Sequence, residues 1–254
     1  MKALLVASAL VLGFAAPAGR DAAPRPAGPP DGRLVLAVLS PERVIVADPL
    51  TGRTRERELR SGTLCHGPLI VTGDRVVYFD LRRGRLVAHA APLDRLGRDR
   101  PVAAAGLAEA EAHAGAEFLT TDGRARCRGS CRRVEIRNGP ALDAPPGIRP
   151  QAGPRAAFSP DGRRLALPVE VAGRPRFAVV DVERDAWTVA PGAQAGDYAA
   201  LAWSPSGDWL YLAARGARLL AWRGGSARPR ALRIRTGGRV MSIATASRRG
   251  SAAL

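Results

Sequence analysis

Lysine is almost absent from this sequence. Lys2 is the only lysine among 39 basic residues in a chain of 254, and 23 acidic residues leave a formal net charge of +16. The preference for arginine is better explained by the codon usage of a GC-rich genome than by selection for the forked guanidinium group. The excess of positive charge predicts attraction to anionic partners: nucleic acid, anionic lipid or acidic envelope polymers.

Long apolar runs are also missing from the body of the chain. Hydrophobic residues make up 46% of the sequence, which excludes a wholly disordered chain. No stretch of about 20 apolar residues is available to span a bilayer, which excludes a polytopic membrane protein.

Motifs for common chemistries are absent. The sequence has no glycine-rich phosphate loop, no HExxH, no GxSxG and no dense Asp/Asn calcium loop. Its three histidines, His66, His89 and His113, lack metal-ligand spacing to one another. Cys65 and His66 would point to opposite faces of a strand. The sequence therefore predicts no catalytic residue, no cofactor and no metal site.

Residues 1–18 have the pattern of an export signal. Lys2 precedes an uncharged apolar stretch, and Ala16-Pro17-Ala18 forms a small-x-small cleavage site. An uncleaved N-terminal anchor is the alternative. Residues 19–30 are rich in proline and alanine and are expected to be a linker. Export to the periplasm or the outside argues against genomic nucleic acid as a partner, and no membrane span is expected after cleavage.

The body of the chain contains a repeat. Phe158–Leu167 (FSPDGRRLAL) recurs 45 residues later as Trp203–Leu212 (WSPSGDWLYL). Each copy predicts a short strand ending in an aromatic residue, a turn, and a second, alternating strand. These copies and three weaker ones have their turn glycines at Gly32, Gly73, Gly123, Gly162 and Gly207.

Further strand candidates follow each turn, such as RVIVA at 43–47 and RFAVVDV at 176–182. Four short strands in about 40–45 residues is the period of a propeller blade. Helical propensity is confined to residues 103–114, which we expect to decorate the connection into the third unit.

The stretch at 158–182 resembles the β-propeller repeat of TolB-like and WD40-like proteins, in which an aromatic-Ser-Pro-Asp-Gly turn precedes an apolar strand ending in Asp. Residues 44–52 (VIVADPLTG) are similar to the second half of that repeat. The resemblance extends loosely over residues 31–245. It implies an all-β fold, a β-propeller of about five four-stranded blades.

The ends of this region predict how the ring closes. Residues 31–36 resemble a second strand without a first, and Arg239–Thr245 lies where a new first strand is due. Pairing the two would close five blades and remove open sheet edges. The alternative is an incomplete six-bladed propeller with a stub at 251–254. Residues 246–254 are otherwise expected to form a basic tail.

Cys127 and Cys131 flank a three-residue loop between two strand-like runs. Opposed positions in such a hairpin lie within disulfide range, and an exported chain meets an oxidising compartment. We predict a disulfide; a reduced pair and a metal or redox site are the alternatives. Cys65 is left over and is expected to be a buried free thiol, with an intermolecular bridge as the alternative.

Positive charge gathers after Asp208, the last acidic residue of the chain. Arginines alternate along a predicted outer strand at Arg228, Arg230, Arg233 and Arg235. They are interpreted either as protection of a sheet edge or as a surface for an anionic partner. Trp209 and Trp222 offer a stacking platform beside them, although a core role is favoured for both.

Two functions remain open. The favoured one is a secreted or envelope-associated propeller, expected to be monomeric, that acts as a binding or scaffolding module for a protein or an anionic envelope component. On this interpretation the chain is not an enzyme. The alternative is a propeller enzyme, such as a lactonase-like hydrolase or a lyase, which needs carboxylates and histidines from several blades to converge on one point.

Overall fold

The computed structural model describes residues 28–59, 69–82, 85–102, 119–120, 123–128, 131–151, 155–225 and 227–247. Every regular element in this part of the chain is a β-strand, and no helix in it is long and apolar enough to cross a membrane. The predicted export signal, nearly all of the linker, the helical stretch at 103–114, and Cys65, His66 and His113 lie outside the described residues.

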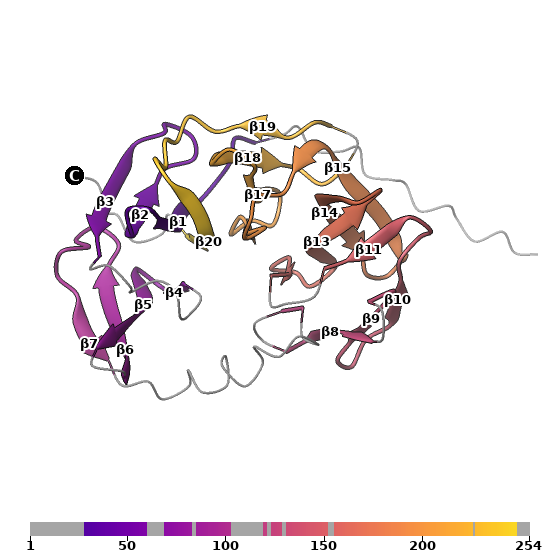
Figure 1. Ribbon diagram of the computed structural model, residues 1–254, viewed down its shortest axis with the longest axis horizontal. Helices are drawn as coiled ribbons and strands as arrows, with labels where there is room; N and C mark the ends of the chain where they lie inside the picture. The colour runs from indigo at the N-terminus through magenta and orange to yellow at the C-terminus, as the bar shows by residue number, and fades with distance from the viewer. Residues whose placement is uncertain are drawn as a thin grey trace, which may run out of the picture.

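Antiparallel sheets stand around a ring (Figure 1). The first sheet has the order β20 (Arg239–Ala246), β1 (Arg33–Leu39), β2 (Arg43–Ala47) and β3 (Thr54–Glu58). The second has β4 (Ile70–Thr72), β5 (Arg75–Arg82), β6 (Arg85–Pro92) and β7 (Arg100–Val102). The third has β8 (Ala125–Arg128), β9 (Arg133–Ile136) and β10 (Ala141–Asp143).

Two more sheets complete the described part of the ring. The fourth has β11 (Ile148–Pro150) and β12 (Ala157–Phe158), both paired with β13 (Arg164–Val171), then β14 (Arg174–Asp181) and β15 (Ala186–Gln194). The fifth has β16 (Leu201–Trp203), β17 (Leu210–Ala214), β18 (Arg218–Trp222) and β19 (Arg230–Ala231).

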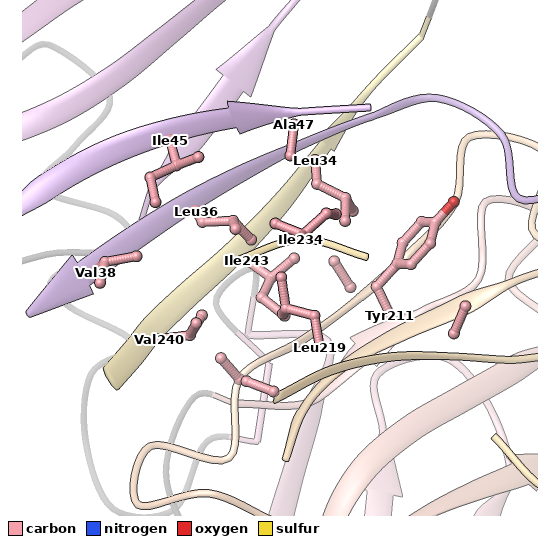
Figure 2. Close-up of a cluster of buried hydrophobic side chains, with 14 of the residues drawn as sticks. Leu34, Leu36, Val38, Ile45, Ala47, Tyr211, Leu219, Ile234, Val240 and Ile243 are labelled. Carbon is pink, nitrogen blue, oxygen red and sulfur yellow. The ribbon is translucent and has the colours of Figure 1, made fainter. Parts of the chain in front are cut away.

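The two ends of the described chain meet in the first sheet. β20 pairs antiparallel with β1, with Leu36 opposite Ile243, so the predicted pairing of Arg239–Thr245 into the first unit is confirmed. Figure 2 shows the side chains of both strands packed in one cluster with Tyr211 of the fifth sheet. The fold is an all-β propeller, and the number of blades in the complete ring stays a prediction.

The repeated turns also touch one another. All five turn glycines have positive φ, from +61° at Gly73 to +81° at Gly32, as the turn motif requires. A Cβ at Gly32 would lie 2.6 Å from the Pro205 ring, and one at Gly207 would lie 3.2 Å from the Pro160 ring. Glycine is therefore needed at Gly32 both for its backbone angle and for the contact with the neighbouring sheet.

The innermost strand of the fourth sheet is interrupted. Residues 151–156 separate β11 from β12, whereas only Leu167 and Pro168 separate the partners of these strands on β13. Gln151 still continues the pairing with β13, because its N–H donates to the Pro168 carbonyl at 3.0 Å. Gln151 and Arg155 both line a pocket described below.

Candidate binding surfaces

The sequence-predicted arginines lie together on the outer edge of the fifth sheet. Arg228, Arg230, Arg233 and Arg235, here the β19 arginine face, are all exposed. β19 is only two residues long and both are exposed, so it is shorter than the predicted outer strand. Burial alternates only from Arg233 to Thr236, where Ile234 and Thr236 are buried and the two arginines are exposed. All four arginines are thus solvated, although only Arg230 belongs to the paired strand.

These four guanidinium groups have no carboxylate within ion-pair distance among the described residues. Some arginines elsewhere are paired: Arg126 lies 2.8 Å from Glu135, and Arg239 lies 3.2 Å from Asp197. Because no acid follows Asp208 in the sequence, the positive potential along β19 is not locally compensated.

The two tryptophans near this face belong to the core, as expected. Trp222 is 1% exposed and Trp209 is 7% exposed. The Arg230 guanidinium lies 4.4 Å from the centre of the Trp209 ring, and that of Arg223 lies 5.8 Å from it. Trp209 is therefore no platform for a ligand; its ring instead attracts and positions Arg230.

Other arginines are committed to contacts between sheets. Arg124 lies 4.2 Å above the ring of Phe158, and Arg164 lies 4.6 Å above the ring of Trp203. Arg164 also donates a hydrogen bond to the Gly207 carbonyl, at 2.5 Å. The basic residue after a turn glycine thus covers the aromatic residue of the next repeat. This role was missed in the sequence, where the two residues lie in different units.

A polar cluster joins the first and second sheets. Oδ1 of Asp99 accepts a hydrogen bond from Arg57 at 2.5 Å, and Oδ2 accepts one from Tyr78 at 2.7 Å. Nδ1 of His89 lies 3.1 Å from the same Oδ2. The Tyr78 and His89 rings are stacked. These four residues are here called the Asp99 cluster. His89 is 3% exposed, so it is a core histidine.

Opposing effects act on the pKa of Asp99. Partial burial raises it, while the hydrogen bonds from Tyr78 and Arg57 and the positive charge of Arg57 lower it, and the net pKa is below the ordinary value. The carboxylate is therefore charged at neutral pH. It ties a strand of one sheet to two strands of the next, which is a structural role.

A polar pocket lies between the fourth and fifth sheets. Its volume is about 500 Å³, within the usual range for small-ligand sites. The lining residues come from the connection between β11 and β12, the start of β14, the end of β15 with the segment after it, and the β17–β18 turn: Gln151, Arg155, Pro175, Gln194, Ala195, Gly196, Asp197 and Arg215. This pocket was not predicted, because its lining combines residues of two sheets that lie far apart in the sequence.

No group of three or more His, Cys, Asp or Glu residues in the described ranges is placed to hold a metal ion.

A disulfide joins Cys127 of β8 to Cys131 in the turn before β9, with the Cα atoms 4.9 Å apart. The two cysteines are not opposed strand positions as predicted, because Cys127 lies opposite Val134. We expect alkylation under denaturing, non-reducing conditions to label Cys65 alone, measured by peptide mass spectrometry. Replacing both paired cysteines by serine is expected to lower the free energy of unfolding by about 2 kcal/mol, the value for so short a loop. Labelling of all three cysteines would contradict the disulfide.

Comparison with known proteins assigns the chain to no family. No family model matches it, and no curated protein matches it. Among solved structures, it is similar to TolB from Acinetobacter baumannii (13% identity over 79% of this chain and 41% of that one, TM-score 0.28). It is also similar to BamB from Moraxella catarrhalis (16% identity over 78% of this chain and 56% of that one, TM-score 0.26).

A third similar structure is the β-propeller domain of Cps50 (Swd1) from Myceliophteria thermophila (14% identity over 75% of this chain and 67% of that one, TM-score 0.26). The chain is similar to TolB-like and WD40-like propellers. It spans less than two thirds of the TolB and BamB chains. The strand pairing and ring closure of this chain, rather than these low scores, carry the assignment of its propeller fold.

Proposed function

We propose that the chain is an exported β-propeller that binds an anionic partner, a protein or an acidic envelope component, through the β19 arginine face. One observation carries the proposal: four exposed arginines fall within eight residues at and around β19, with no carboxylate in ion-pair distance among the described residues. The export pattern at residues 1–18 supports the compartment, and the position of Arg230 over the Trp209 ring supports a binding rather than a solubilising role.

The strength of such a surface can be bounded. An exposed ion pair contributes about 0–1 kcal/mol, so four of them give modest affinity that falls steeply with salt. Arg230 loses less conformational entropy than the others on binding, because Trp209 already holds its side chain. The face is therefore suited to a reversible, salt-sensitive contact with a multivalent anion.

Protection of the sheet edge is the competing role for the same residues. β19 is a short outer strand, and exposed charges prevent such an edge from pairing with another molecule. The two roles differ when the charges are removed. Loss of edge protection predicts self-association, whereas loss of a binding surface leaves a monomer that no longer retains an anion.

Replacing Arg228, Arg230, Arg233 and Arg235 together by glutamine is expected to lower the salt concentration at which the protein elutes from immobilised heparin. A matched variant loses the same formal charge at exposed arginines that face carboxylates: Arg126, Arg133, Arg149 and Arg184. It should elute at higher salt than the first variant. Size-exclusion chromatography at the same protein concentration should show both as monomers.

Elution of the two variants at the same salt concentration would refute a specific surface, because retention on heparin would then depend on net charge alone. Oligomers of the β19 variant alone would assign the arginines to edge protection. Cross-linking capture from the cell envelope, repeated at raised salt, then identifies the partner; capture that does not weaken with salt would contradict an electrostatic contact.

A further inference from the structure

The pocket between the fourth and fifth sheets has a fixed floor. The Ala195 N–H donates to the Pro175 carbonyl of β14, and the Gly196 N–H donates to the Ala213 carbonyl of β17, both at 3.1 Å. The Arg215 N–H donates to the Gln194 carbonyl at 3.0 Å. Backbone hydrogen bonds from both sheets therefore hold residues 194–196, which form one side of the pocket, before any ligand arrives.

The charge of the lining is positive. Asp197 is already paired with Arg239, at 3.2 Å. Arg155 and Arg215 are exposed and have no carboxylate partner among the described residues. Two guanidinium groups thus remain for an anion, and their planar forks match the two oxygens of a carboxylate.

Two carboxamides complete the polar lining. Gln151 and Gln194 are partly buried, and no hydrogen bond among the described residues engages either side chain. Each carboxamide both donates and accepts hydrogen bonds, which is what an amide group in a ligand requires. Pro175 and Ala195 give the pocket only a small apolar area, which favours a ligand with small side groups.

We propose that this pocket binds a small carboxylate with an amide group beside it, as at the free carboxyl end of a peptide. Arg155 and Arg215 hold the carboxylate, and Gln151 and Gln194 pair with the neighbouring amide. The two carboxamides favour a carboxylate with a neighbouring amide over inorganic phosphate, which has no amide group. The site is separate from the β19 arginine face and does not depend on it.

Isothermal titration calorimetry with acetyl-Ala-Ala, which has a free carboxylate, tests the proposal directly. Saturable binding of acetyl-Ala-Ala is expected. The affinity for acetyl-Ala-Ala-amide should be lower by at least about tenfold, because each hydrogen bond to a charged group contributes about 1.5–3 kcal/mol. Arg155→Gln and Arg215→Gln are each expected to weaken acetyl-Ala-Ala by a similar factor. Arg230→Gln, on the β19 arginine face, is the matched control and should not change the affinity.

The outcomes separate the alternatives. No saturation by acetyl-Ala-Ala, equal binding of its amide, or unchanged affinity in both pocket variants would overturn the proposal. Inorganic phosphate that binds as tightly as acetyl-Ala-Ala would show a general anion site and overturn the carboxylate assignment. Thermal melting of each variant checks that its fold is intact. Retention on heparin, measured in parallel, reports the β19 face independently, so the two proposals can fail separately.

Discussion

A chain that ends at Gly238 is expected to lose its cooperative unfolding transition. The truncation removes β20, whose Val240, Ile243 and Ala246 are buried, and uncovers the opposite edge of β1. Each large apolar side chain removed from the core costs about 1.5–3 kcal/mol, and the ladder of hydrogen bonds with β1 is lost as well. The total is comparable with the whole net stability of a domain, about 5–15 kcal/mol.

Circular dichroism during thermal denaturation measures this effect, and size-exclusion chromatography reports aggregation through the exposed β1 edge. A chain that ends at Ser247 is the control, because it keeps all of β20. A sharp transition at an unchanged temperature in the shorter chain would show that the ring does not need the closing strand.

Asp99→Asn is expected to lower the free energy of unfolding by about 2–4 kcal/mol at pH 7, because Arg57 then keeps a partly buried charge without its carboxylate. Tyr78 loses its carboxylate acceptor, and His89 loses the charged group 3.1 Å from its Nδ1. Asp94→Asn is the control: its carboxylate is 56% exposed and lies 3.7 Å from the equally exposed Arg95, so removing it should cost less than about 1 kcal/mol. Chemical denaturation of both variants measures the difference.

The dependence on pH follows from the same carboxylate. The pKa of Asp99 in the folded chain is lowered, from about 3.9 in an unfolded chain. The unfolded state therefore binds the proton more readily, and the stabilisation from Asp99 is complete above about pH 5 and is lost as the pH falls through the folded pKa. Asp99→Asn should flatten this acid limb of the stability profile. An unaltered slope would show that other carboxylates dominate it.

The turns and the ring closure could be predicted because each depends on local residue chemistry and spacing. The Ser-Pro-Asp-Gly pattern fixes the turn at Gly162, and the count of strands places Arg239–Thr245 beside β1. The export signal and the anionic partner are still predictions. The alternation of the sequence predicted that the arginines at 228–235 would be solvated, and all four are exposed in the structure.

The Asp99 cluster and the pocket could not be predicted, since both join residues from separate sheets. Tyr78 and His89 face each other only because of the register of β5 and β6, and Arg57 reaches Asp99 from the neighbouring sheet. Arg155, between β11 and β12, and Arg215, after β17, line the same pocket from two different sheets. Such contacts depend on how the sheets pack, and no single repeat contains that information.

The pairing of β20 with β1 also sets an order of events in folding. Arg33 lies opposite Ala246, so these contacts link the first and last strands of the described chain. A chain emerging from its N-terminus presents β1 and β2 long before β20 exists. The apolar faces of β1 and β2 stay uncovered until β20 pairs with β1, and contacts between residues so distant in sequence form slowly. The interval before the last strand arrives is when this protein is most open to misassembly, and when a chaperone would contribute most.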